Sequence, residues 1–141
     1  MFYLITVANI IIFVVISAIH FYWVIVNREF DLQPVIPHIN GKPVFIPTRL
    51  GGSFIATLLL GASVLIYLNA DNILSFIPDT LYKIALGVLS AIMFLRAVGE
   101  FRLVGFFKKI KDSKFAEMDT KYYSPLCLYL CISCLYLVLK N

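Results

Sequence analysis

Four long apolar blocks, separated by polar segments, dominate the hydrophobic pattern of the chain. They cover residues 2–26, 50–70, 81–107 and 122–139, and the first two contain no charged residue. A helix needs about 20 apolar residues to cross a bilayer, and it satisfies its own backbone hydrogen bonds there. The polar–apolar alternation of outer-membrane barrel strands is missing. The pattern therefore predicts an all-α, polytopic membrane protein, a four-transmembrane-helix bundle in one membrane domain.

Composition agrees with this assignment. Hydrophobic residues make up 61% of the 141 residues and charged residues only 14%, whereas soluble domains carry roughly 25% charged residues. The excess apolar surface must face lipid. The first block is longer than the apolar region of a secretory signal and lacks basic residues before it, so we expect it to remain as a helix.

The segment between the first two blocks, residues 27–49, contains four prolines, which exclude a helix. Asn40-Gly41 lies between two short apolar runs, which is a strong signal for a tight hairpin turn. The prolines weaken any strand pairing around it. We therefore expect a compact hairpin flap at one end of the bundle, whose exact form stays open.

Basic residues indicate the orientation, because short cytoplasmic loops are enriched in them. Only Lys83 and Lys140 belong to the side of the termini, and the opposite side holds Arg28, Lys42, Arg49, Lys108, Lys109, Lys111, Lys114 and Lys121. Both termini are therefore expected outside. The basic juxtamembrane loop 108–121 would lie inside, either in the headgroup plane or as a solvated turn. The net charge of +4 thus reflects orientation, and no nucleic-acid partner is predicted.

The third block carries charges where a bilayer helix tolerates them poorly, at about 2.5–3.5 kcal/mol each. Arg96 and Glu100 are four residues apart and share a helix face. Their order is the weaker one for a pair within one helix, so we expect each to find its main partner on another helix.

Depth in the membrane suggests further members of this polar cluster. Late residues of the first and third helices lie at the same level as early residues of the second and fourth. The predicted ligand-binding residues are Arg96, Glu100, His20, Trp23, Arg49 and Tyr123. They either converge on one inner-leaflet cavity or lock the helices together by hydrogen bonds.

Three functions fit this cluster. The first is binding of a membrane lipid or another amphiphilic ligand, with Arg96 holding its anionic group. The second is an intramembrane enzyme that uses His20 and Glu100 as acid and base on an apolar substrate. The third is a structural subunit of a larger membrane complex or a homo-oligomer.

No metal or cofactor is predicted. His20 and His38 lack ligand-like spacing, and nucleotide-binding motifs are missing. Cys131 and Cys134 form a C-x-x-C pair, which is compatible with thiol redox chemistry. Without an activating helix N-terminus or basic neighbour, these cysteines are better explained as small packing residues.

Three stretches carry a resemblance to a known family. They are Arg96–Lys108, with the sequence RAVGEFRLVGFFK, Asp119–Cys127, with the sequence DTKYYSPLC, and His20–Trp23. In these the chain resembles the small bacterial membrane proteins catalogued as domain of unknown function 3995. The resemblance implies a four-helix protein of the bacterial cytoplasmic membrane, and it implies no activity.

Overall fold

The computed structural model describes residues 1–26, 33–70 and 77–140. Four helices in it are long and apolar enough to cross a membrane. Their apolar length follows directly from the four blocks of the sequence, and the predicted four-helix architecture is confirmed. The elements, in chain order, are α1 (Phe2–Val26), β1 (His38–Ile39), β2 (Lys42–Pro43), α2 (Arg49–Ala70), α3 (Asp79–Val98), α4 (Lys114–Met118), the π-helical turn η1 (Asp119–Tyr123) and α5 (Ser124–Lys140).

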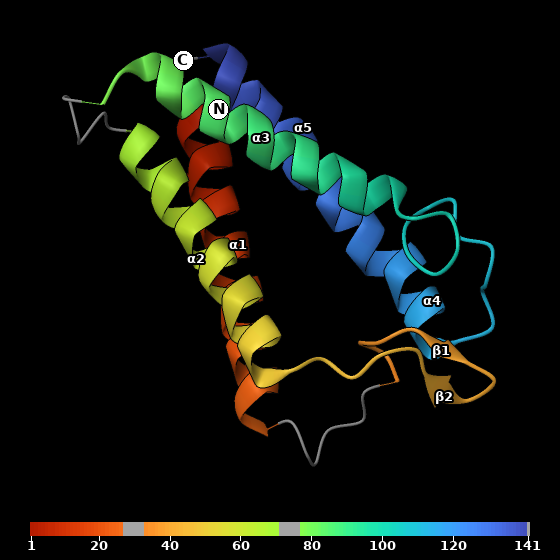
Figure 1. The fold of residues 1–141 in the computed structure, drawn as a ribbon. Helices are drawn as coiled ribbons and strands as arrows, with labels where there is room; N and C mark the ends of the chain where they lie inside the picture. The colour runs from red at the N-terminus through yellow and green to blue at the C-terminus, as the bar shows by residue number, and fades with distance from the viewer. Residues whose placement is uncertain (27–32, 71–76, 141) are drawn as a thin grey trace.

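The helices form two antiparallel pairs. α1 packs along α2, and α3 packs along α5 (Figure 1). The pairs meet at the end of the molecule that holds both termini and diverge toward the other end (Figure 1). Side chains from all four helices fill the junction between them, including Phe13, Ile66, Leu86 and Leu130, all buried. The core therefore lies at the terminal end of the bundle, and the opposite end is left open to loop segments.

Serine side chains join neighbouring helices within the apolar region. Ser17 Oγ of α1 donates to the carbonyl of Ala56 at 2.7 Å. Ser90 Oγ of α3 donates to the Cys131 carbonyl of α5 at 2.8 Å. Small residues of this kind let helix backbones approach closely where lipid offers no hydrogen-bond partner. Between the pairs, Ser133 Oγ donates to Asn9 Oδ1 at 2.9 Å, which ties α5 to α1.

The third helix is shorter than predicted. It ends at Val98, and residues 99–113 form a folded loop in place of the expected helix through Phe107. Gly99 and Gly105 have φ of 81° and 89°, and these left-handed conformations break a helix. The Phe106 N–H donates back to the Ala97 carbonyl at 2.9 Å, which turns the chain sharply.

The basic loop 108–121 is likewise not a loop throughout. A helix begins at Lys114 because Ser113 caps it, accepting a hydrogen bond from the Ala116 N–H at 3.1 Å. From there α4, η1 and α5 run as one continuous helix of 27 residues to Lys140.

The structure contains the hairpin expected at Asn40-Gly41. β1 pairs antiparallel with β2, with His38 opposite Pro43. Asn40 and Gly41 have φ of 51° and 74°, which matches the turn that an Asn-Gly pair favours. The hairpin lies beside α4 (Figure 1). Residues 27–32 of the predicted flap fall outside the described residues.

Candidate functional site

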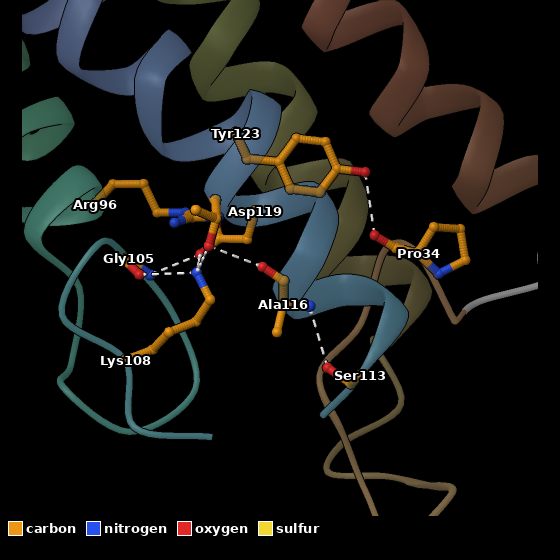
Figure 2. A network of polar contacts seen from close by, with 9 residues as sticks. Pro34, Arg96, Gly105, Lys108, Ser113, Ala116, Asp119 and Tyr123 are labelled. Carbon is orange, nitrogen blue, oxygen red and sulfur yellow. Dashed lines mark hydrogen bonds and ion pairs between the residues drawn. The ribbon is translucent and has the colours of Figure 1, made fainter. Parts of the chain in front are cut away.

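A buried carboxylate organises the open end of the α3–α5 pair. Asp119, in η1, is fully buried. Its oxygens accept hydrogen bonds from Arg96 Nη2 at 2.9 Å, from the Gly105 N–H at 2.8 Å and from Lys108 Nζ at 3.0 Å (Figure 2). These donors come from the end of α3 and from the loop that follows it. One side chain therefore joins a helix end, a loop and the start of the fourth membrane helix.

Lys108 completes this ionic cluster, which we define as Arg96, Lys108 and Asp119. Its side chain is only 1% exposed. Besides Asp119, Nζ donates to the Gly105 carbonyl at 3.0 Å and to Thr120 Oγ1 at 2.6 Å. All three ammonium hydrogens thus have acceptors. Such full pairing is what makes burial of a lysine tolerable.

The predicted residues Arg96 and Tyr123 lie on this side of the molecule. Arg96 finds its partner outside its own helix, as its sequence context suggested, and Nη1 has no partner among the described residues. The Tyr123 hydroxyl donates to the Pro34 carbonyl at 3.1 Å (Figure 2). Glu100 is exposed, and its carboxylate accepts from the Leu103 N–H within the loop.

The predicted residues His20 and Trp23 lie elsewhere, on the wall of a cavity of about 470 Å³. It is formed by the end of α1, the start of α2 and the segment 35–48. Its lining consists of His20, Trp23, Val24, Val35, Ile36, Phe45, Pro47, Thr48, Gly51, Gly52, Phe54 and Ile55. None of these described lining residues is an Asp, Glu, Lys or Arg.

The six predicted binding residues therefore do not line one cavity. His20 and Trp23 belong to the cavity, whereas Arg96 binds Asp119. Arg49 and Glu100 are exposed, and neither lines the cavity. The physical reason is the divergence of the helix pairs toward this end (Figure 1). Equal depth in a membrane does not bring side chains together when their helices spread apart.

Local packing fixes the polar groups of the cavity wall. His20 Nδ1 lies 2.8 Å from the Ile16 carbonyl of its own helix. The His20 and Trp23 rings pack against each other with centroids 5.0 Å apart. Thr48 and Gly51 also line the cavity, and Thr48 Oγ1 accepts the Gly51 N–H at 3.1 Å. Gly52 permits the close approach of α2 to α1, because a Cβ there would lie 2.5 Å from Val24 Cγ2.

A family model described as protein of unknown function, DUF3995, matches residues 13–134, which is most of the chain. The chain belongs to this family. The matched region includes both the ionic cluster and the cavity. No curated protein and no solved structure matches the chain. The DUF3995 description names no activity.

Two residues of the ionic cluster, Lys108 and Asp119, are not among the predicted binding residues. Both lie in the segment predicted as a basic loop, although each is a terminal residue of a stretch that carries the DUF3995 resemblance. Arg96 opens the stretch that Lys108 closes, and Asp119 opens the second stretch. The available signal was an aspartate three residues before the last apolar block, together with an arginine in the preceding block that lacked a partner on another helix.

The described part of this DUF3995 protein contains no cluster of side chains that could hold a metal ion. Within residues 1–26, 33–70 and 77–140, no three His, Cys, Asp or Glu side chains are grouped so as to hold an ion. Cys127, Cys131 and Cys134 are free thiols, and Cys134 is fully buried in the helix core.

Proposed function

We propose that the protein binds an uncharged amphiphile, with the apolar part of the ligand held in the cavity between α1, α2 and residues 35–48. The observation that carries this proposal is the cavity itself. It is about 470 Å³ in volume, within the roughly 300–1,000 Å³ of small-molecule sites. It lies at the ends of two membrane-length helices, and its described wall is apolar apart from a few hydrogen-bonding groups.

The lining favours an uncharged ligand over an anionic one. A carboxylate or phosphate placed among apolar side chains requires a cationic partner, since burying an unpaired charge costs several kcal/mol. Arg96 supplied that partner in the sequence-based hypothesis. In the structure its Nη2 is bound to Asp119, and Arg96 does not line the cavity.

An acid–base enzyme has less support. Such a mechanism needs both proton-transferring groups within reach of one substrate. His20 lines the cavity, whereas Glu100 is exposed beyond the end of α3 and is bonded to the loop backbone. The arrangement therefore favours binding over proton transfer between these two residues.

The proposed location is the bacterial cytoplasmic membrane, with both termini outside. In Figure 1 the two termini share one end of the molecule, and β1, β2 and α4 lie at the other end. The latter end holds most of the basic residues, as a cytoplasmic side does. This orientation places the cavity toward the inner leaflet.

Filling the cavity should weaken binding, and the chain offers a matched pair of glycines for the test. Gly51→Phe adds a ring on the cavity wall, where an added Cβ meets only Thr48 Oγ1, at 3.1 Å. We expect apparent affinity to fall at least about tenfold, because the ring occupies the ligand's volume. The probe is a long-chain primary alcohol with bromine on its chain, and quenching of Trp23, the one tryptophan of the sequence, reports its contact.

Gly61→Phe is the control, because Gly61 is an exposed residue of the same helix, does not line the cavity and has nothing within 4 Å of an added Cβ. It should quench as the wild type does. Equal quenching in both variants would mean that the probe reaches Trp23 from the surrounding detergent or lipid, and the proposal would then be wrong.

A further inference from the structure

We infer that the ligand carries a hydroxyl group, which donates a hydrogen bond to His20 Nε2. This inference rests on the proposed function and adds the chemical class of the ligand: a long-chain alcohol or an alcohol-bearing lipid, in contrast to esters, ethers and fatty-acid anions of similar shape.

The protonation of His20 is set by its partner. Nδ1 lies 2.8 Å from the Ile16 carbonyl oxygen, and a carbonyl oxygen accepts hydrogen bonds but cannot donate them. Nδ1 must therefore carry the hydrogen. In the neutral ring the other nitrogen, Nε2, then has a lone pair and acts as an acceptor.

The residue that carries this acceptor lines the cavity. Its Nδ1 is bonded to the carbonyl one helical turn earlier, which leaves Nε2 as the ring nitrogen available to a ligand. Trp23 packs beside the imidazole, with ring centroids 5.0 Å apart. No hydrogen bond joins Nε2 to any residue of the described part of the chain. A polar group on an apolar wall gains from a partner, since an unpaired one is costly.

The other residues of the cavity wall limit which hydrogen-bond donor the ligand can carry. A cationic ammonium donor would need a counter-charge, and no carboxylate is among the described lining residues. A hydroxyl is neutral, donates one hydrogen bond and keeps its own oxygen as an acceptor. Thr48 Oγ1 accepts from the Gly51 N–H, so its own hydrogen is left to donate to that oxygen. An alcohol thus supplies the donor that Nε2 needs without bringing a charge into the cavity.

The test compares two probes on the unmodified protein. A bromine-labelled long-chain alcohol and its methyl ether have nearly the same chain and differ in the donor. We expect the ether to quench Trp23 with roughly five- to tenfold weaker apparent affinity, the usual effect of one missing hydrogen bond. Equal affinities for the two probes overturn the inference.

Two substitutions locate the effect at one nitrogen. His20→Asn keeps an amide donor near the Nδ1 position and removes the acceptor at Nε2, so alcohol and ether should bind alike. His20→Gln extends an amide to the Nε2 position and should keep a preference for the alcohol. If both variants retain the full preference, His20 is not the acceptor and the inference fails.

The two proposals fail in different ways. If Gly51→Phe and Gly61→Phe quench equally, no ligand occupies the cavity and the proposed function is lost. If Gly51→Phe blocks both probes but the wild type binds alcohol and ether equally well, the cavity binds an apolar chain without a hydrogen bond to its hydroxyl group. Only the assignment of the ligand class falls in that case.

Discussion

Asp119→Asn is expected to lower the free energy of unfolding by about 3–5 kcal/mol, the usual cost of removing one partner of a buried ion pair. The amide has nearly the same shape, so packing is preserved. The negative charge is lost, however, and the ammonium of Lys108, 1% exposed, stays buried without a counter-charge. Arg96 loses its charge partner among the described residues as well.

Thermal or denaturant unfolding of the purified protein, followed by circular dichroism, measures this loss. Glu117→Gln is the matched control, because Glu117 is an exposed carboxylate of the adjoining helix α4. It should change stability by less than about 0.5 kcal/mol. Equal stability of the two variants would show that the charge of Asp119 is dispensable.

A double variant separates the lost charge from the lost hydrogen bonds. Adding Lys108→Met to Asp119→Asn removes the unpaired ammonium and replaces it with an apolar side chain of similar length. We expect part of the stability to return, because replacing both members of a buried pair costs less than breaking it. A further loss in the double variant would mean that Lys108 stabilises the loop independently of Asp119.

The membrane helices could be predicted because their cause is local. Each apolar block is long enough to span a bilayer, and a helix satisfies its backbone without help from the rest of the chain. The hairpin at Asn40-Gly41 was predictable for the same reason, since its left-handed turn is encoded by two adjacent residues.

The end of the third helix could not be read in this way. Residues 101–107 are largely apolar and continue the pattern of the block before them. The chain leaves the helix at Gly99 because the Gly105 N–H and Lys108 bind Asp119, a residue fourteen positions beyond Gly105. These tertiary contacts of the loop outweigh the local preference for a helix, and the hydropathy pattern does not reveal them.

The binding residues show the same limit. Expected depth along the membrane assigned these residues to one end of the bundle, but it gave no lateral position. His20 and Trp23 share a wall because they are three residues apart on α1, whereas Arg96 belongs to the other helix pair. Sequence reasoning found an arginine in need of a partner, and only the fold identified Asp119.

Gly105→Ala is expected to be the second strongly destabilising change. Gly105 has φ of 89°, and holding another residue there costs about 1–3 kcal/mol. An added Cβ would also meet the Val98 carbonyl oxygen and the backbone of Gly99. These are backbone atoms that cannot turn aside, so overpacking adds roughly 1–3 kcal/mol more. The same unfolding measurement reports the loss.

Gly87→Ala is the control for this substitution, because Gly87 lies within α3 and an added Cβ meets nothing within 4 Å. There alanine should be neutral or stabilise by up to about 1 kcal/mol through its helix propensity. If both variants behaved alike, the sharp turn at Gly105 would not exist in the folded protein.

The two strong predictions are also linked through one hydrogen bond. The Gly105 N–H donates to Asp119 Oδ2 at 2.8 Å, so each substitution disturbs a contact that the other also needs. The combined loss in Gly105→Ala with Asp119→Asn should therefore be smaller than the sum of the single losses, by about 0.5–3 kcal/mol. Strict additivity would mean that loop 99–113 keeps its shape without Asp119, and the ionic cluster would then stabilise the helix ends alone.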